Sequence, residues 1–402
     1  MVVRCASPAD WCAQMDPSKK SACAAADLTD DIIVEILSRL PVKSICRFKC
    51  VSWHWYGLIT HSEHRKKIPQ TLSGFFYGFV HHRGRFNREE NDIIIFSDFM
   101  DITVREELLF LDPSLPFLTG YRQIIPKTCC NGLLFCLCRK VFPRDEANYV
   151  VCNPATEKWF VLPESDYDSG ACAYRFGFDP AISSHFHVFQ ILEEDQGYGF
   201  IAVAGVNIYS SETGAWSRKA NGWGNNLQLV DSIEFFFKGM LHLMTNCFKL
   251  LAVDTQGKIC RTIPLLETMC AENFCTDIFS SNLTLIGQSR GQLYYFNTRE
   301  RDLSVLSVWI LEDYDSDEWI FKYNISTSQL FGEKGLGFAL IAIHPECSLI
   351  YFVWKCEGIL MSYDMERGKV CVVCNAMERL YDPVLYYLPY VPFLSGSARL
   401  EA

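Results

Sequence analysis

The chain has 402 residues, of which 49% are hydrophobic, 14% aromatic and 21% charged, and its formal net charge at pH 7 is −10. This composition predicts a folded globular protein of two or three domains and argues against long disorder. The longest uninterrupted apolar stretch, residues 336–343, is far shorter than the roughly 18 residues that cross a membrane, so we expect no membrane segment.

Charge is distributed unevenly along the chain. Residues 1–27 carry three basic and three acidic side chains, and residues 28–67 carry seven Lys/Arg against four Asp/Glu, or +3; residues 68–402 therefore carry −13. This acidic body argues against nucleic acid as its main partner. Residues 1–27 show neither a hydrophobic period nor the apolar core of a signal peptide, and we predict a disordered leader there.

Residues 28–59 have the apolar spacing of three short helices. Thr29 or Asp30 can cap the first helix, Pro41 ends it, and a second helix is predicted from Pro41 to about Cys50. The apolar face of the first helix is predicted to carry Ile32, Ile33, Ile36, Leu37 and Leu40, and the third helix carries Val51, Trp53, Trp55, Leu58 and Ile59. Three helices of this size cannot enclose a full core, so apolar surface should remain for a partner.

The same segment carries a set of residues at fixed spacing. They are Leu28 with Asp31, then Glu35-Ile36-Leu37, Arg39-Leu40-Pro41, Lys43-Ser44, Arg47-Phe48, Val51-Ser52 and Trp55. In this respect the segment resembles an F-box, the helical module that docks on the Skp-type adaptor of cullin–RING ubiquitin ligases. Thr29 stands where the family prefers Pro, and Trp53 where a basic residue is common. The alternative is a helical segment that merely packs on the body.

The resemblance implies a domain and a docking surface. We expect an F-box module over residues 28–69, followed by a second domain over residues 70–397. The side chains expected to contact the adaptor are Leu28, Ile32, Ile36, Leu37, Leu40, Pro41, Val51 and Trp55.

From residue 70 onward, the pattern changes to period-two alternation broken by turns. A strand that ends in a polar turn recurs six times, with starts 42 to 57 residues apart, at 107–114, 149–159, 206–216, 250–258, 306–319 and 359–369. Three copies have an upstream strand that begins with Gly at a turn, at 131–137, 238–244 and 290–296; Gly there permits the positive φ of a hairpin. A repeat near 50 residues is typical of one four-stranded blade of a β-propeller.

The expected fold is therefore a small all-α module followed by an all-β domain, a β-propeller of about six blades. Residues 384–394 could add a strand to the first blade near residues 72–80 and so close the ring, which would remove exposed sheet edges. The alternative is a β-sandwich or a pair of stacked β domains.

Several short motifs occur in order along the region after residue 70. They are Asn131-Gly132-Leu133-Leu134, Cys152-Asn153-Pro154-Ala155-Thr156 with Trp159, Phe176-Gly177-Phe178-Asp179-Pro180, Gly239-Met240-Leu241, and Val308-Trp309 with Trp319. In their order behind an F-box, they resemble the F-box-associated, kelch-like region of plant F-box proteins. That resemblance implies a substrate-recruiting domain, although the double glycines of strict kelch repeats are missing.

Several patterns that could carry chemistry have a simpler interpretation. Gly287-Gln288-Ser289-Arg290-Gly291 matches a nucleophile elbow, but a strand rather than a helix follows it, so we predict a hairpin tip. Cys371 and Cys374 have the spacing of zinc ligands without a second pair. The histidine pairs 81–82 and 185/187 could hold a metal ion, and the acidic run 312–318 could bind Ca²⁺ or a basic peptide, but solvated surface is the default interpretation.

Nineteen cysteines are present. Because many lie within apolar runs, we expect buried thiols in a reducing compartment rather than disulfides. The examples are Cys136, Cys138, Cys152 and Cys260.

Three functions follow as hypotheses. The first is the substrate-recognition subunit of an SCF-type (Skp–cullin–F-box) E3 ubiquitin ligase, a non-catalytic adaptor with no cofactor, whose partners are a Skp-type protein, through it a cullin–RING ligase, and an unknown protein substrate. The second is a propeller-based enzyme or binder of a small ligand or metal. An F-box protein that acts outside ubiquitination is a third. We expect a cytoplasmic or nuclear location; the substrate-binding residues are not predictable.

Overall fold

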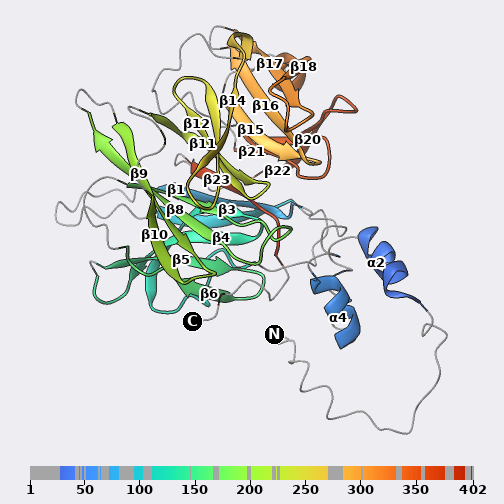
Figure 1. Cartoon of the computed structure of the whole chain (residues 1–402). Coiled ribbons are helices and arrows are strands. Elements are labelled where there is room, and N and C mark those ends of the chain that lie inside the picture. Colours follow the sequence, from blue (N-terminus) through green and yellow to red (C-terminus); the bar gives the residue numbers. More distant parts are fainter. Residues whose placement is uncertain are drawn as a thin grey trace, which may run out of the picture. The chain divides into compact units, whose positions relative to one another are not determined.

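A computed structural model gives the architecture of the chain (Figure 1). It describes residues 28–40, 45, 48, 51–61, 64, 72–80, 95–102, 111–144, 146–165, 172–196, 201–219, 223, 227–269, 284–299, 302–331, 337–354, 358–375, 384–393 and 400. The chain divides into two compact units between Pro69 and Gln70. The predicted leader, residues 1–27, lies outside the described residues.

The N-terminal unit is a helical module built around two described helices, α2 (Asp30–Ser38) and α4 (Trp53–Thr60). The Ser52 hydroxyl caps α4 by accepting a hydrogen bond from the backbone N–H of Trp55 at 3.2 Å. Asp30 and Asp31 lie in the first turn of α2, where the helix dipole favours negative charge. Of the second predicted helix, only Ile45 and Phe48 are described, and both are helical.

The C-terminal unit is a six-bladed β-propeller, which confirms the predicted fold class and sets aside the β-sandwich. Each blade is one antiparallel sheet. Blade 1 contains β1 (Gly74–Val80), β2 (Ile95–Asp101) and β23 (Val384–Tyr390). Blade 2 contains β3 (Tyr121–Cys130), β4 (Leu133–Lys140), β5 (Ala147–Asn153) and β6 (Lys158–Val161). Blade 3 contains β7 (Cys172–Gly177), β8 (His187–Asp195), β9 (Ile201–Ser210) and β10 (Ala215–Lys219).

Blades 4 to 6, like blades 2 and 3, have four strands each, whereas blade 1 has three described strands. Blade 4 contains β11 (Leu229–Phe237), β12 (Met240–Thr245), β13 (Lys249–Val253) and β14 (Ile259–Pro264). Blade 5 contains β15 (Thr284–Ser289), β16 (Gln292–Arg299), β17 (Asp302–Leu311) and β18 (Ile320–Ser326). Blade 6 contains β19 (Phe338–Ile343), β20 (Leu349–Trp354), β21 (Ile359–Asp364) and β22 (Lys369–Asn375). Two short helices, η2 (Glu267–Met269) and α6 (Thr327–Phe331), follow blades 4 and 5.

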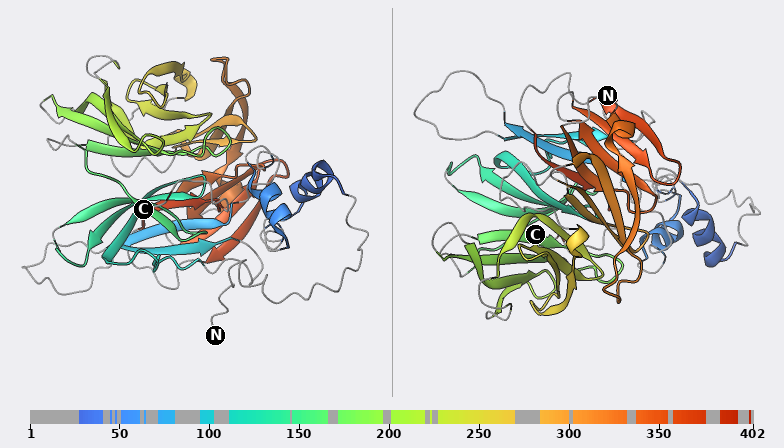
Figure 2. Two further views of the ribbon diagram at one scale, coloured as in Figure 1. Left: turned by 60° about the horizontal axis from the view of Figure 1, so that its bottom comes forward. Right: turned by 90° about the horizontal axis from the view of Figure 1, so that it is seen from above.

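The ring closes through the C-terminal strand, as the sequence predicts. One edge strand of each blade lies beside its counterpart in the next, in the circular order β3, β7, β11, β15, β19 and β23 (Figure 2). In blade 1 this inner strand is β23, which pairs antiparallel with β1, Phe76 opposite Leu388. The first and last described strands therefore share one sheet, and unfolding one end of the propeller removes pairing from the other.

The sequence repeat marks one strand in each of blades 2 to 6. The recurring strand is the third of its sheet, namely β5, β9, β13, β17 and β21. Of the copy at 107–114, residues 107–110 lie outside the described residues and residues 111–114 form a turn region instead of the predicted strand. The three upstream segments are second strands, and each follows a two-residue hairpin whose central residues both have positive φ: Asn131-Gly132, Lys238-Gly239 and Arg290-Gly291. Two positive φ values define the type I′ turn, which matches the twist of the strands it joins.

Apolar side chains fill the space between neighbouring blades. Blades 5 and 6, for example, share a core in which Phe296 and Leu306 pack with Ile350 and Phe352. Four cysteines in apolar runs were expected to be buried; this holds for Cys136, Cys138 and Cys152, but Cys260 is exposed. Cys260 lies on the outer strand β14, whose alternate residues face solvent, and only Ile259 of its two sequence neighbours is apolar, since Arg261 follows it.

Candidate functional site

Helix α2 has two apolar rows, not one. Ile33 and Leu37 form the first row and, with Val34, are buried against Ile45, Leu58 and Ile59. Ile32 and Ile36 form a second row with 47% and 40% of their surface exposed, and Leu28, which precedes the N-cap Thr29 and lies four residues before Ile32, is 43% exposed. Because neighbouring residues differ by about 100° around a helix, the second row points away from the module's own core.

The eight side chains predicted to contact the adaptor differ in their solvent exposure. Leu28, Ile32, Ile36 and Val51 are exposed, Val51 at 59%. Leu40 and Trp55 are half-buried against the module's own core. Pro41 lies outside the described residues.

Leu37 corrects the sequence interpretation. Its side chain is fully buried inside the module, so in this structure it stabilises the fold instead of facing a partner. The sequence prediction assigned both rows to one apolar face, because the two rows are offset by only about one residue.

Polar groups flank the exposed row, which we call the outer stripe (Leu28, Ile32 and Ile36). Arg39 and Glu35 form an i,i+4 ion pair at 2.6 Å, and His54 Nε2 of α4 lies 2.9 Å from the Asp30 carboxylate of α2. All four side chains are more than half exposed, so these contacts add little to stability. An apolar stripe with a polar rim is the usual anatomy of a protein-binding surface.

In the propeller, the motif residues hold blades together. The Asn131 side chain donates a hydrogen bond to the Phe178 carbonyl at 2.7 Å, joining blade 2 to the start of the turn after β7. The Asn153 side chain donates to the Phe393 carbonyl at 2.7 Å and is almost fully buried. These asparagines therefore secure ring closure and inter-blade turns, and their role is structural.

The recurring tryptophan also joins blades. Trp216, on the fourth strand of blade 3, donates its Nε1–H to the Pro163 carbonyl at the end of blade 2, at 2.9 Å. Trp319, just before the fourth strand of blade 5, donates to the Pro264 carbonyl at the end of blade 4, at 3.1 Å. The two contacts are equivalent, so the motif selects a tryptophan because it supplies both an apolar ring and one hydrogen-bond donor.

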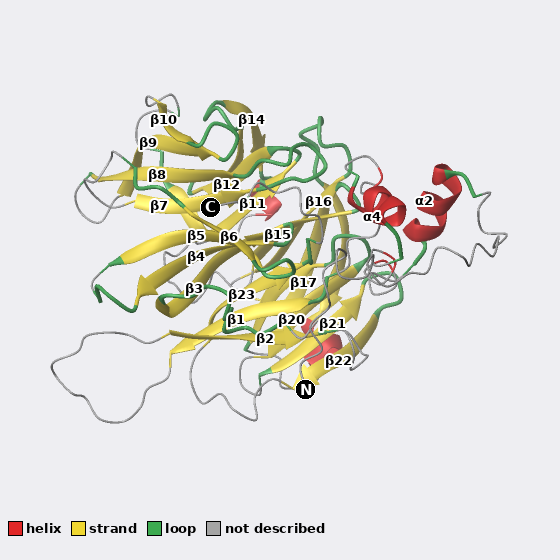
Figure 3. Ribbon diagram, turned by 90° about the horizontal axis from the view of Figure 1, so that it is seen from below, coloured by secondary structure: helices red, strands yellow, loops and turns green. Residues whose placement is uncertain are grey.

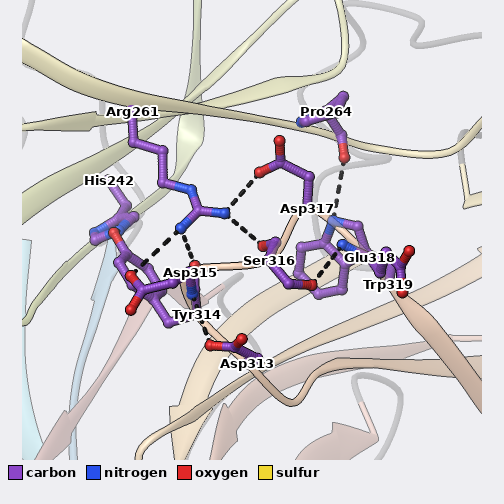
Figure 4. A network of polar contacts seen from close by, with 10 residues as sticks. All are labelled: His242, Arg261, Pro264, Asp313, Tyr314, Asp315, Ser316, Asp317, Glu318 and Trp319. Atoms are coloured by element: carbon purple, nitrogen blue, oxygen red, sulfur yellow. Dashed lines mark hydrogen bonds and ion pairs between the residues drawn. The ribbon is translucent and has the colours of Figure 1, made fainter.

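The acidic run at residues 312–318 is a turn that binds a neighbouring arginine (Figure 4). Arg261, on the fourth strand of blade 4, donates hydrogen bonds to the carbonyls of Tyr314 and Ser316 and to the Asp317 carboxylate. Its guanidinium also lies over the Tyr314 ring, 5.1 Å from the centroid. The five acidic side chains of the turn are exposed, as the solvated-loop interpretation predicts, and the turn in addition contacts blade 4 through Arg261.

A buried histidine completes this contact. His242 Nε2 lies 2.7 Å from the Tyr314 hydroxyl, and its Nδ1 lies 3.1 Å from the Met240 carbonyl. Burial, followed by the charge of Arg261, lowers the pKa of His242 to about 4. The imidazole is therefore neutral near pH 7 and serves the packing of blade 4 against blade 5.

The other chemical motifs take simple structural roles. Ser289 closes the predicted hairpin between β15 and β16 and is buried at 2% exposure, and its hydroxyl donates to the Cys347 carbonyl. Cys371 and Cys374 are free thiols on β22, and His81 and His82 lie outside the described residues.

Neither a metal cluster nor a spanning helix is found in the part of the chain that the structure describes. No group of three or more His, Cys, Asp or Glu side chains there could hold a metal ion. For the pair at 185 and 187, burial lowers the pKa of His187 to about 4. The described helices are also too short or too polar to cross a membrane.

Comparison with known proteins identifies both units. Residues 26–67 match the model of the F-box domain, and residues 108–386 match the family described as "F-box protein At3g26010-like, beta-propeller". The chain belongs to this F-box β-propeller family. The helical module is its F-box, and the six blades are its propeller.

Relatives of this F-box protein come from Arabidopsis thaliana. F-box protein At5g07610 is 28% identical over 331 residues, which cover 78% of this chain and 73% of the relative. F-box protein At2g15640 is 24% identical over 415 residues, covering 88% of this chain and 93% of the relative. Among solved structures, a nidogen/laminin complex aligns with a TM-score of 0.39 at 9% identity and covers 80% of this chain and 99% of the other.

Sequence reasoning missed the partner of the acidic turn in this F-box protein. Arg261 and Asp317 are 56 residues apart, and they meet only because consecutive blades stack. The surplus of five acidic side chains within seven residues was the available signal, since so dense a group needs a cation nearby or solvent around it.

Proposed function

We propose that this F-box protein is the substrate-recognition subunit of an SCF-type E3 ubiquitin ligase. The F-box docks on a Skp-type adaptor and, through it, joins a cullin–RING ligase, while the propeller holds a protein substrate. The observation that carries the proposal is the outer stripe of α2, whose three aliphatic side chains are 40–47% exposed beside an already filled module core. The F-box match over residues 26–67 supports the same assignment.

The physical basis of docking is burial of this stripe. Covering a Leu or Ile side chain stabilises a complex by about 1.5–3 kcal/mol for full burial, and these side chains begin roughly half-covered. Val51, at 59% exposure, adds a further aliphatic contact. We propose that Trp55 acts indirectly, because its ring packs on Phe48 with centroids 5.0 Å apart and thereby holds the helical segments in place.

The propeller contributes by position instead of by bond chemistry. A substrate held on it has a high effective concentration near the conjugating enzyme, and this alone accelerates transfer of ubiquitin to its lysines. We therefore propose a non-catalytic role without a cofactor. The proposed assignment of the domain as kelch-like rests on motif order alone, because the matched family is described only as a β-propeller.

We also propose the cytosol or nucleus as the compartment. Eleven cysteines among the described residues are free thiols, which suits a reducing environment.

Co-purification tests the proposal. The full chain should retain an Arabidopsis Skp-type adaptor, whereas the full chain with Ile32→Asp and Ile36→Asp should not. Retention of the adaptor by the double variant would contradict docking through the outer stripe.

A further inference from the structure

Blade 2 contains a basic segment within the acidic propeller. Residues 113–144 hold five Lys/Arg and no Asp/Glu, whereas residues 68–402 as a whole carry −13. Including Asp145 and Glu146, the balance over residues 113–146 is 5 − 2 = +3. Like charges gathered in this way repel one another and attract acidic partners. The five cations are Arg122, Lys127, Arg139, Lys140 and Arg144.

The fold brings most of these cations to one end of the blade. Tyr121 at the start of β3 lies opposite Lys140 at the end of β4, so Arg122, Arg139 and Lys140 lie at the same end. That end is opposite the Asn131-Gly132 turn, where β3 ends and β4 begins. Figure 3 shows β3, β4 and β5 side by side, with the loop that connects β4 to β5 at the end of the hairpin.

Hydrogen bonds hold this end in one conformation. The backbone N–H of Val141 donates to the Gly120 carbonyl at 3.0 Å, and that of Lys140 donates to the Glu146 carbonyl at 2.9 Å. The Arg122 guanidinium donates to the Arg144 carbonyl at 3.3 Å, which ties the start of β3 to the β4–β5 loop. These hydrogen bonds hold the backbone of the described loop residues 140–144 against the start of β3. We call Arg122, Lys140, Val141, Phe142 and Arg144 the basic tip.

An aromatic ring stands at the centre of the basic tip. Phe142 is 86% exposed, the highest value among the exposed large hydrophobic side chains of the described residues, and its neighbour Val141 is 55% exposed. A Phe held in water on a fixed loop forgoes the stabilisation that burial would give, about 1.5–3 kcal/mol. Exposed aromatic side chains beside Arg are frequent anchors of protein interfaces.

The electrostatics of the tip are consistent with a site for negative charge. The acidic side chains whose charges act on Lys140 are Glu146 and Glu164. Lys140 already pairs with Glu146 at 2.6 Å, and hydrogen bonding to that carboxylate raises the pKa of Lys140. Carboxylates from a partner would add ionic contacts to Arg122 and Arg144, the arginines of the basic tip.

We propose that the basic tip binds an acidic peptide segment that also places an apolar side chain on Phe142. The segment belongs to the substrate, so the inference deepens the proposed function and names its substrate class. Carboxylates of the segment pair with Arg122 and Arg144, and the apolar side chain covers the ring of Phe142.

Fluorescence anisotropy with the purified full chain tests this inference. The probe is a fluorescein-labelled copolymer of Glu and Tyr, measured at low ionic strength. Because the chain carries −10 overall, repulsion opposes binding of this probe except at a basic site. Arg122→Glu with Arg144→Glu should weaken binding by at least about tenfold, and Phe142→Ser by about twofold to tenfold.

Matched controls separate the tip from bulk charge. Arg218→Glu with Lys258→Glu makes the same change in net charge at exposed positions of blades 3 and 4 and should alter affinity by less than about twofold. The single variant Arg144→Glu covers the case in which loss of the Arg122 hydrogen bond disturbs the loop. Failure of the unaltered chain to bind the copolymer, or an equal loss in the control variant, would overturn the inference.

The proposed function and this inference can be contradicted separately. All tip variants should still co-purify with the Skp-type adaptor, and the Ile32→Asp, Ile36→Asp variant should still bind the copolymer. Adaptor loss in tip variants that remain folded would contradict the assignment of the tip to substrate.

Discussion

Arg261 on β14 donates a hydrogen bond to the carboxylate of Asp317 at 2.6 Å and so fastens blade 4 to the turn of blade 5. The arginine side chain is 18% exposed, and it also donates to two backbone carbonyls of the same turn. The acidic turn is thus an element of the inter-blade packing: Arg261 of the preceding blade pairs with Asp317, and Lys322 of blade 5 pairs with Glu312.

Arg261→Met should destabilise the propeller by about 2 kcal/mol or more, because it leaves carbonyls of the turn without a donor in a partly buried place. Urea denaturation followed by tryptophan fluorescence measures the change. Arg367→Met is the matched control: its side chain is 83% exposed and 3.7 Å from Asp364, so it should change stability by less than about 0.5 kcal/mol. Equal effects of the two variants would contradict the structural role of Arg261.

The two inter-blade tryptophans should differ in their contribution. Trp319 is 5% exposed, whereas Trp216 is only half-buried, so replacing the indole with a phenyl ring removes more buried packing, together with the hydrogen bond, in the first case. Trp319→Phe should cost about 1–3 kcal/mol and Trp216→Phe about 1 kcal/mol or less. Thermal unfolding of both variants gives the comparison. A larger cost at Trp216 would contradict this ranking by burial.

Gly177 is required where blades 3 and 4 approach. A Cβ at this position would lie 2.4 Å from ring atoms of Phe236, so Gly177→Ala should destabilise the propeller by about 1–3 kcal/mol. The second substitution Phe236→Leu should recover part of this loss, because it removes the clashing ring atoms. Gly214→Ala, which meets open space at φ +67°, should cost about 1 kcal/mol without such rescue. Additive effects of Gly177→Ala and Phe236→Leu would contradict the contact.

Stability should depend on pH through His242. Burial lowers its pKa to about 4 in the folded chain, below the ordinary value of 6.5, so between these values the unfolded chain binds more protons. Stability therefore falls as pH decreases from 6.5 toward 4 and is insensitive to this group above 6.5. His242→Gln should reduce the difference in Tm between pH 6.5 and pH 5, a range in which few carboxylates titrate. An unchanged difference would argue against this assignment.

Much of the fold could be predicted because strand alternation and turn chemistry are local. The third strands of blades 2 to 6 and the Gly turns were visible in the sequence, and so was closure by residues 384–394. The two rows of α2 could not be separated, since Ile32 and Ile33 are equally apolar and only packing decides which is buried. The Arg261–Asp317 contact and the basic tip depend on stacking and hairpin geometry, which local patterns do not encode.

Docking through the outer stripe is tested most directly by a quantitative adaptor-binding measurement on the full chain. Ile32→Asp with Ile36→Asp should weaken binding to a Skp-type adaptor by about a hundredfold or more, since two aliphatic contacts are lost and two charges are placed in the interface. Ile201→Asp with Val372→Asp, at exposed aliphatic positions of the propeller, is the matched control and should leave the affinity unchanged. Unchanged affinity of the stripe variant, with both proteins folded, would contradict the account.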